Sequence, residues 1–529
     1  MRRGLPMTTM MIAILAAGTA FAGDWPQWLG PNRNGIAAES PPLVDGFTDG
    51  VPKRLWTSEE IIGGWSGGWG TVAVADGCAY VFSSHNFDVP IPHRKLDKGG
   101  LERLGWAADM PEELSKKVEE ARTGEERKAL KDGRAVNVWA DKWMQENVTR
   151  EQRRYRGAVQ TRLRAGDAAV PLDILARLAT VQDREFPTQE ALDAWFTENG
   201  IDDAAKKQID RVIPTTKRQA RDFLLCTDAA DGSTKWKKEF PATAMSYPGS
   251  ATPCVVDGHV YLLNSEGYVY CLSAVDGSVL WKTDTLKQPN WGRTRSSSAA
   301  VVDGVVVVMT EACLIALDAQ TGEKLWSERK IRNEGASPTP WTTDGKSYVL
   351  ANGGNKLNLV EVKTGKVVWS VKGGGEGSAV VAGDVVVLAS GKAAGGVAAY
   401  TLSLEEPKEL WRVPLDDDYT SPVVYEGHVY AIGLHAGKWR AVCIGLASGK
   451  VLWEEPLPKS SEYSTPIVAD GKLIAVCAKS LHLIRATPEK YSLLGKADLG
   501  VEPWTSPTFA DGKAFLRTAK AILCFDLKK

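Results

Sequence analysis

The sequence predicts an all-β fold, an eight-bladed β-propeller with an α-helical insertion in its first blade. Two observations predict the blades: a tryptophan recurs every 42 to 45 residues through the middle of the chain, and an Asp-Gly pair or a close variant recurs with a similar period. A period of this length is typical of a four-stranded propeller blade. A third observation, a charged stretch without the repeat, predicts the insertion.

Each repeat contains the signals of four short strands. In the clearest copy, Ser296 to Trp326, a serine leads into an apolar strand, the Asp303-Gly304 turn, two further strands, an Asp-x-x-Thr-Gly turn and a tryptophan strand. Asp-Gly favours a two-residue hairpin because both residues can adopt positive φ. The repeating tryptophans are Trp236, Trp281, Trp326, Trp369, Trp411 and Trp453. The eight first turns are Asp76-Gly77, Asp257-Gly258, Asp303-Gly304, Asp344-Gly345, Gly383-Asp384, Glu426-Gly427, Asp470-Gly471 and Asp511-Gly512.

The two ends of the chain predict how the ring closes. A single blade leaves both of its faces apolar, so it must stack on neighbours, and a closed ring leaves no free edge. The last repeat, Trp504 to Cys524, stops after its third strand. The segment Pro52 to Thr57 has the sequence of the missing tryptophan strand. We therefore expect it to pair with the end of the chain.

The insertion interrupts the first blade between its second strand, Ala79 to Ser84, and its third, Phe223 to Thr227. Its helical segments are expected at 111–130, 148–163, 171–181 and 188–199, with starts at Asp109 and Thr188. An arginine run from Arg150 to Arg164 is interpreted as a solvated helix face rather than an anion site. In a propeller the connection that carries the insertion opens onto the face where the innermost strands begin. We therefore expect the insertion to cover that face.

The N-terminus predicts export. Arg2 and Arg3 precede an apolar run that ends in Ala20-Phe21-Ala22, which is the pattern of a cleaved signal peptide. We expect a periplasmic or secreted protein without a membrane span, because no later apolar stretch is long enough to cross a bilayer. The 64 basic and 65 acidic residues leave a net charge of -1, which gives no basis for nucleic-acid binding. The expected parts are a signal peptide (1–22), an N-terminal segment and start of the first blade (23–86), the helical insertion (87–221) and the rest of the propeller (222–529).

The repeat resembles the pyrroloquinoline-quinone (PQQ) repeat of quinoprotein dehydrogenases and of the assembly propeller BamB. The opening segment, Asp24 to Gly35, further resembles secreted PQQ-like repeat proteins of planctomycete-type bacteria. The resemblance implies a propeller and a structural, tryptophan-docking role for the repeating indoles. It is weak for function, because propellers carry many unrelated activities.

A candidate ligand site is expected where the innermost strands begin. The residues at those positions are Trp69, Ser250, Ser296, Ser337, Gly375 or Glu376, Tyr419, Tyr463 and Trp504. The four aromatic residues fall in consecutive blades and would form one wall, suited to a planar or sugar-like ligand. Tyr247, Arg293, Arg295 and Glu334 are expected close by. The alternative is that the rings only plug the funnel.

These features favour a binding or scaffold protein over an enzyme, with a partner protein, glycan or small ligand and a monomeric state. The alternatives are a PQQ-dependent oxidoreductase and a BamB-like envelope-assembly factor. Under the oxidoreductase alternative, the resemblance implies PQQ and Ca²⁺ as cofactors. The sequence contains neither an adjacent cysteine pair nor a Cys-x-x-Cys-His haem motif. We predict no metal site and no cofactor. The eight cysteines are expected to be free thiols, with Cys226, Cys271, Cys443 and Cys524 at one blade position and no pairing indicated for the others.

Overall fold

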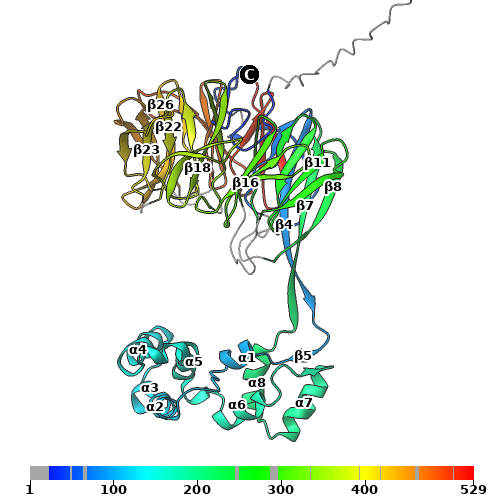
Figure 1. The fold of residues 1–529 in the computed structure, drawn as a ribbon, viewed down its shortest axis with the longest axis vertical. Coiled ribbons are helices and arrows are strands. Elements are labelled where there is room, and N and C mark those ends of the chain that lie inside the picture. The colour runs from blue at the N-terminus through cyan, green and yellow to red at the C-terminus, as the bar shows by residue number, and fades with distance from the viewer. Residues whose placement is uncertain are drawn as a thin grey trace, which may run out of the picture. The chain divides into compact units, whose positions relative to one another are not determined.

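The computed structural model describes residues 23–47, 50–63, 68–244, 249–285, 296–333, 335–391, 394–416, 419–458, 464–503 and 505–529. The chain divides into a sheet unit, Met1–Asn86 with Ala220–Lys529, and a helical unit, Phe87–Gln219 (Figure 1). The expected signal peptide, residues 1–22, lies outside the described residues. None of the helices in the described ranges combines the length and the apolar character needed to cross a bilayer.

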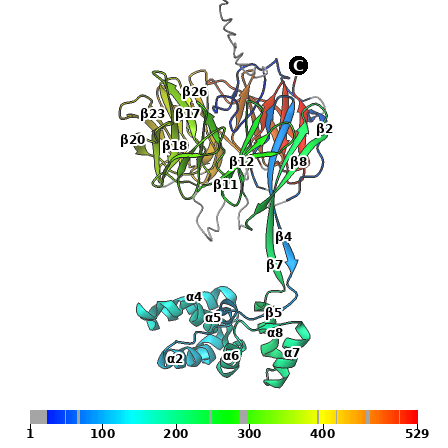
Figure 2. The ribbon, with the colours of Figure 1, turned by 45° about the vertical axis from the view of Figure 1, so that its right-hand side comes forward.

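In the described residues, the sheet unit contains eight successive sheets of four or more strands (Figure 2). The first four sheets are β3 (Ala73–Ala75), β4 (Cys78–Pro90), β7 (Thr216–Asp228) and β8 (Thr234–Ala242); β9 (Cys254–Val256), β10 (His259–Leu263), β11 (Tyr268–Ser273) and β12 (Val279–Asp284); β13 (Ala300–Val302), β14 (Val305–Met309), β15 (Leu314–Asp318) and β16 (Lys324–Glu328); and β17 (Thr339–Thr343), β18 (Lys346–Gly353), β19 (Lys356–Glu361) and β20 (Val367–Lys372).

The next three sheets are β21 (Val380–Ala382), β22 (Val385–Leu388), β23 (Val397–Thr401) and β24 (Glu409–Val413); β25 (Val423–Tyr425), β26 (His428–His435), β27 (Lys438–Gly445) and β28 (Val451–Pro456); and β29 (Ile467–Ala469), β30 (Lys472–Cys477), β31 (Ser480–Arg485) and β32 (Leu493–Asp498) with β1 (Ile36–Ala37) added parallel to β29. The last sheet contains β33 (Thr508–Ala510), β34 (Lys513–Arg517), β35 (Ile522–Asp526) and β2 (Lys53–Thr57).

The strand supplied by the N-terminal segment is confirmed. β2 pairs antiparallel with β35, so that Trp56 lies opposite Cys524 and Thr57 opposite Leu523. The indole of Trp56 also donates to the carbonyl of Ala229 at 3.2 Å, which belongs to the first sheet. The first and last sheets are therefore joined directly.

The turn chemistry is confirmed in seven of the eight first turns. In the Asp-Gly turns and in Glu426-Gly427 both residues have positive φ, as in Asp303 (φ 50°) and Gly304 (φ 72°). The Gly383-Asp384 turn differs, because only Gly383 has positive φ there. With glycine first, that turn matches the hairpin type that needs one left-handed residue.

Each repeating tryptophan joins its sheet to the next. The indole N–H of Trp281, for example, donates to the carbonyl of Ala319 at 3.1 Å, and its ring packs on Gly322, where a Cβ would come 2.5 Å from the ring. Equivalent bonds of 2.6 to 3.0 Å are made by Trp236, Trp326, Trp369, Trp411 and Trp453. Trp236, Trp326 and Trp411 pack on a turn glycine of the next sheet in the same way, at Gly277, Gly365 and Gly449, so that in these sheets the tryptophan and the glycine form one contact.

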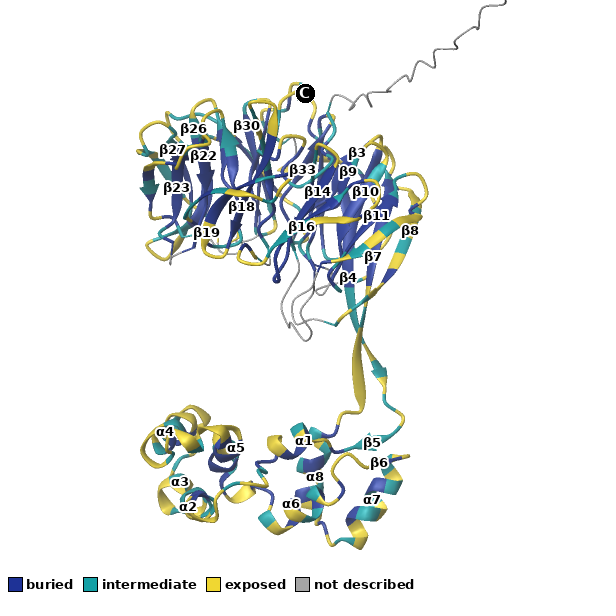
Figure 3. Cartoon of the chain, viewed as in Figure 1, coloured by how far each residue is buried: buried dark blue, intermediate teal, exposed yellow. Residues whose placement is uncertain are grey.

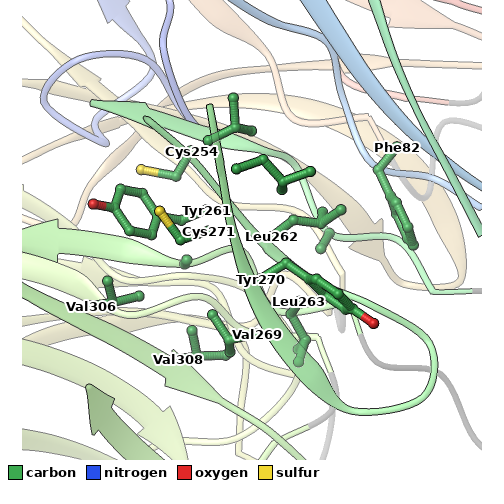
Figure 4. Close-up of a cluster of buried hydrophobic side chains, with 14 of the residues drawn as sticks. Phe82, Cys254, Tyr261, Leu262, Leu263, Val269, Tyr270, Cys271, Val306 and Val308 are labelled. Carbon is green, nitrogen blue, oxygen red and sulfur yellow. The ribbon is translucent and has the colours of Figure 1, made fainter. Parts of the chain in front are cut away.

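The core of the sheet unit lies between neighbouring sheets (Figure 3). Figure 4 shows one such layer, in which Tyr261 and Cys271 of the second sheet lie near Val306 and Val308 of the third. Apolar faces of this kind contribute roughly 25 cal/mol per Å² of buried area. Each sheet therefore buries its apolar faces against the neighbouring sheets.

Residues 24–37 form a segment across the innermost strands, which we call the plug. Its backbone bonds to Val74, Val255 and Val468, in the first, second and seventh sheets. Arg33, a residue of the plug, has a buried side chain. Its guanidinium donates hydrogen bonds to the carbonyl oxygens of Pro338, at 2.5 Å, and of Ala299. Burial lowers the pKa of Arg33 to about 10. These bonds attach the plug to the third and fourth sheets.

The helical unit contains two apolar cores. Leu114, Val118 and Leu163 belong to one core, and Leu175, Phe196 and Ile209 to the other. Its helices are α1 (Lys98–Arg103), α2 (Glu112–Thr123), α3 (Glu125–Ala129), α4 (Gly133–Asn147), α5 (Arg156–Ala165), α6 (Leu172–Ala179), α7 (Gln189–Glu198) and α8 (Asp203–Val212), with the short strands β5 (Arg94–Lys95) and β6 (Glu185–Phe186).

Helices α1, α4 and α8 lie outside the four helical segments expected from the sequence, and two further details of this unit differ from expectation. Thr188 caps α7 as predicted, but Asp109 does not cap α2; its carboxylate instead accepts from the hydroxyl of Tyr155 at 3.3 Å. The arginine run is exposed except for Arg162, which is buried and pairs with Glu119. The helical spacing turns Arg162 inward, where the Glu119 carboxylate offsets the desolvation of its charge.

Candidate functional site

A row of buried hydroxyls links the sheets where their innermost strands begin. In each link the backbone N–H of one Ser or Thr donates to the hydroxyl oxygen of the equivalent residue in the next sheet, at 2.8 to 3.0 Å. We call this row the hydroxyl belt. Its members are Thr71, Thr252, Ser298, Ser337, Ser378, Ser421, Thr465 and Ser506. In five of the eight repeats the belt residue is followed by proline, as in Thr252-Pro253 and Ser506-Pro507. The recurring Ser or Thr has a structural cause, since a hydroxyl at this position pairs an otherwise orphaned N–H.

The belt fixes which residues stand at the start of each strand, and it corrects one expectation. Ser337 was expected at the mouth because it lies three residues before the proline of the Thr339-Pro340 pair. It belongs instead to the belt, since the Ser337-Pro338 pair aligns with the Ser/Thr-Pro pairs of the other sheets. Gly335 takes its place. The same alignment selects Glu376 over Gly375, and the side chain of Glu376 lies against Gly335, where a Cβ would come 2.8 Å from its own Cβ.

We call the residues two positions before the belt the mouth. In the described residues they are Trp69, Ser250, Ser296, Gly335, Glu376 and Tyr419. Trp69 is half-buried, and its backbone N–H donates to the Ser250 hydroxyl at 2.8 Å. Tyr419 is 43% exposed. The mouth thus combines aromatic surface with hydroxyl and carboxyl groups.

Tyr247, Arg293, Arg295, Glu334, Tyr463 and Trp504 lie outside the described residues. Of the eight predicted ligand-binding residues, the structure describes Trp69 and Tyr419, on the first and sixth sheets. The expected aromatic wall stays a prediction.

Two buried ionisable residues were missed from the sequence, and one of them, Arg517, contacts the backbone next to Trp69. Arg517, at the end of β34, donates to the carbonyl of Gly70 at 2.9 Å, and burial lowers the pKa of Arg517 to about 9. Asp222, on β7, accepts from the Ser84 hydroxyl at 2.5 Å and from the Ser265 hydroxyl at 2.8 Å. Burial raises the pKa of Asp222 to about 6. Neither residue belongs to the repeat, so its period gave no signal for them.

The donor chemistry offers no metal centre in the described ranges, where no three His, Cys, Asp or Glu side chains are grouped to hold one ion. Glu376 is the carboxylate of the described mouth, whereas a Ca²⁺–quinone site needs several oxygen donors. The described residues do not fit such a site, and we derive no step through a quinone. The eight cysteines are free and buried, as expected.

The model of the family described as outer membrane protein assembly factor BamB matches residues 210–403 and 398–490, more than half of the chain. No curated protein sequence matches the chain.

Among solved structures, BamB from Moraxella catarrhalis is similar, with 16% identity over 57% of this chain and 88% of that chain and a TM-score of 0.46. Quinohemoprotein alcohol dehydrogenase from Comamonas testosteroni is similar with 13% identity over 58% of this chain and 72% of that chain, and a TM-score of 0.43.

Proposed function

The chain belongs to the PQQ-like repeat family of the assembly factor BamB, and on this premise we propose that it is an exported eight-bladed propeller that binds a ligand or partner at its mouth. The ligand classes that suit the site are a glycan, a planar small molecule or a segment of an envelope protein. Binding is favoured over oxidation because the chain has neither the adjacent cysteines nor the haem motif that commonly accompany quinoprotein chemistry.

The observation that carries the proposal is the position of the plug. Its backbone lies along the middle of the innermost strands, at Val74, Val255 and Val468, and Trp28 reaches as far as the belt hydroxyl of Ser378 at 3.1 Å. The mouth residues stand on the other side of the belt. We infer that a ligand bound at the mouth does not have to displace the plug from the inner strands.

The belt supports binding in a second way. Because its hydroxyls and N–H groups are buried and paired, the strand starts are held rigidly, and a rigid platform loses little entropy when a ligand binds. Above it, Trp69 and Tyr419 present ring faces and hydrogen-bonding edges, a combination that suits sugars and planar ligands. Glu376 adds an acceptor for hydroxyl groups.

The proposal is tested by comparing two tyrosines of the sixth sheet. Tyr419→Ala removes a mouth ring, whereas Tyr425→Ala removes a half-buried ring at the Glu426-Gly427 turn. Binding is measured against a glycan array, an envelope-protein panel and a set of planar aromatic compounds. We expect Tyr419→Ala, and the double change of Tyr463 and Trp504 to Ala, to weaken binding while Tyr425→Ala does not.

Two results would overturn the proposal. If the parent protein binds no probe and the mouth variants only lower the melting temperature, the rings are a structural plug. If the protein reconstituted with PQQ and Ca²⁺ oxidises alcohols or aldoses with a dye acceptor, the oxidoreductase alternative takes first place. Selective binding of nascent outer-membrane proteins would favour the assembly-factor alternative.

A further inference from the structure

The first sheet differs from the following sheets at the point where its second and third strands leave it. In the second, third and fourth sheets, the residue four places before the partner of the repeating tryptophan lies in the turn that joins these two strands; these residues are Gly267, Ala312 and Asn355. The same count from Cys226, the partner of Trp236, leads to Asp222, which lies within β7. There β4 and β7 run on toward the helical unit as a two-stranded segment, residues 85–90 and 216–221, which we call the ribbon (Figure 1).

Asp222 ties the base of the ribbon to the second sheet. Its carboxylate accepts a hydrogen bond from the Ser84 hydroxyl at 2.5 Å and two from Ser265, whose backbone N–H and hydroxyl both lie at 2.8 Å. Ser84 belongs to β4, and Ser265 lies in the turn between β10 and β11. These three residues, which we call the latch, are 3% exposed or less, whereas the residues of the ribbon are half-buried or exposed. The latch is therefore where the buried part of the two strands ends.

The carboxylate of the latch is buried without a cation to balance its charge. Among the described residues it forms no ion pair, and its three hydrogen-bond donors are neutral. The nearest cation along β7, Arg221, pairs with Glu239 on β8. Burial, with a smaller effect of the Glu266 charge, raises the pKa of Asp222 to about 6, although the hydrogen bonds to the latch serines lower it. The ionisable groups next to the latch on β4, β7, β8 and the second sheet are His85, Arg221, Glu239, Glu266 and Tyr270.

We propose that the latch is a pH-sensitive hinge, which acid holds closed and which loosens toward neutral pH, so that the ribbon and the helical unit that it carries move more freely. Opening the latch brings Asp222 into water, where its ionised form is well solvated, whereas closing the latch buries that charge. The closed latch therefore binds a proton more tightly than the open latch. By linkage, protonation of Asp222 favours the closed state.

Protonation does not break the contacts of the latch. The protonated carboxyl can donate its O–H to the hydroxyl oxygen of Ser84, while its other oxygen still accepts from the N–H and the hydroxyl of Ser265. The neutral form of the latch thus has the same three contacts as the ionised form. Acid removes only the cost of the buried charge.

The first test needs no variant. Hydrogen–deuterium exchange of the whole protein is followed by mass spectrometry at pH 5.0 and 7.5, with the rates corrected for the pH dependence of intrinsic exchange. Asp222 loses its proton near pH 6 in the closed latch and, like any solvated Asp, near about 3.9 in the open latch. We therefore expect the opening constant of peptides covering 80–90 and 216–224 to rise about tenfold between the two pH values.

The hairpin of β18 and β19 is the internal control for this measurement, because its two strands close with a turn where the ribbon begins in the first sheet. Its opening constant should not show the rise. An opening constant of the ribbon peptides that is equal at pH 5.0 and 7.5, or larger in acid, would overturn the proposal.

The second test removes the titration. Asp222→Asn keeps the size of the side chain, and its amide can donate to Ser84 and accept from Ser265. This variant should open no more at pH 7.5 than the parent does at pH 5.0. Asp228→Asn is the matched control, because Asp228 ends the same strand but pairs with Lys235 at 3.1 Å, and it should keep the tenfold change. If Asp222→Asn keeps the pH dependence of the parent, or if Asp228→Asn loses it, Asp222 does not control the latch.

Discussion

The backbone N–H of Ser378 donates to the hydroxyl oxygen of Ser421 at 3.0 Å, and both residues are buried between the fifth and sixth sheets. The N–H of Ser421 in turn donates to Thr465 at 3.0 Å. Each belt hydroxyl from Thr252 to Ser506 thus satisfies an N–H of the preceding sheet. The belt connects the sheets by polar contacts where their tryptophan strands are farthest away.

We predict that Ser421→Ala lowers the free energy of unfolding by about 1 to 3 kcal/mol, because it leaves the buried N–H of Ser378 without an acceptor. Ser421→Thr keeps the hydroxyl, and Thr already stands in the belt at Thr252 and Thr465, so its effect should be smaller. Urea unfolding of the two variants beside the parent measures the difference. Equal stability of Ser421→Ala and the parent would show that the hydrogen bond from Ser378 to Ser421 does not stabilise the fold.

The contact between Trp281 and Gly322 gives a second prediction. Gly322 has φ 72°, and a Cβ there would lie 2.5 Å from the Trp281 ring. Gly304 has the same φ of 72° with no atom within 4 Å of a Cβ. Gly304→Ala should therefore cost only the left-handed backbone penalty, about 1 to 2 kcal/mol. Gly322→Ala should cost this and roughly 1 to 3 kcal/mol more for overpacking.

Melting temperatures and urea midpoints of the two alanine variants separate these effects. Because the backbone penalty is shared, the difference between the variants reports the tryptophan contact alone. Variants of equal stability would mean that the indole moves aside without loss.

The sequence predicted what the repeat controls. Asp303-Gly304 and its equivalents located the hairpins, Trp281 and its equivalents located the outer strands, and Trp56 identified the strand that pairs with β35. These features are local or periodic, so one chain is enough to recognise them. Ser337 was misplaced by two residues because the fourth repeat has two prolines, Pro338 and Pro340, and only the hydrogen bond to Ser378 decides between them.

The remaining features depend on contacts between distant segments. Arg33 reaches Pro338 and Ala299 from the N-terminal segment, and Ser84 and Asp222 meet although the helical unit separates them in the sequence. Spacing in the sequence carries no information about such pairs. Helices α1, α4 and α8 were also missed. The apolar face of α8 is limited to residues such as Ala205 and Ile209.

The helical unit should be dispensable for the fold of the sheet unit. Its two cores draw all of their buried residues from 87–219, with Leu163 and Leu175 among those fully buried. We predict that replacing residues 87–219 with a short Gly-Ser turn leaves the main thermal transition within a few degrees of the parent. Calorimetry of the parent should show a separate transition that the shortened protein lacks. Aggregation or a large loss of stability in the shortened protein would show that the sheet unit depends on the helical unit for its fold.

His482 gives a prediction for the pH dependence of stability. It is 4% exposed on β31, and neither ring nitrogen has a hydrogen-bond partner within the described residues. Burial, with a smaller effect of Lys496, lowers the pKa of His482 to about 4 from its usual 6.5. Between those two values the unfolded chain binds a proton that the folded chain does not, so acid favours unfolding.

We therefore compare the parent with His482→Leu by urea unfolding at pH 7.5, 6.0, 5.0 and 4.5. As the pH falls below 6.5, the free energy of unfolding of the parent should decrease relative to that of the variant. The relative decrease should be up to about 1.4 kcal/mol for each pH unit and about 3 kcal/mol in total. Asp222 acts in the opposite direction, because burial raises its pKa to about 6 and the folded chain then holds the extra proton. Since Asp222 is present in both proteins, its contribution cancels in the comparison. Parallel stability curves for the parent and His482→Leu would show that the imidazole takes up its proton in the folded state.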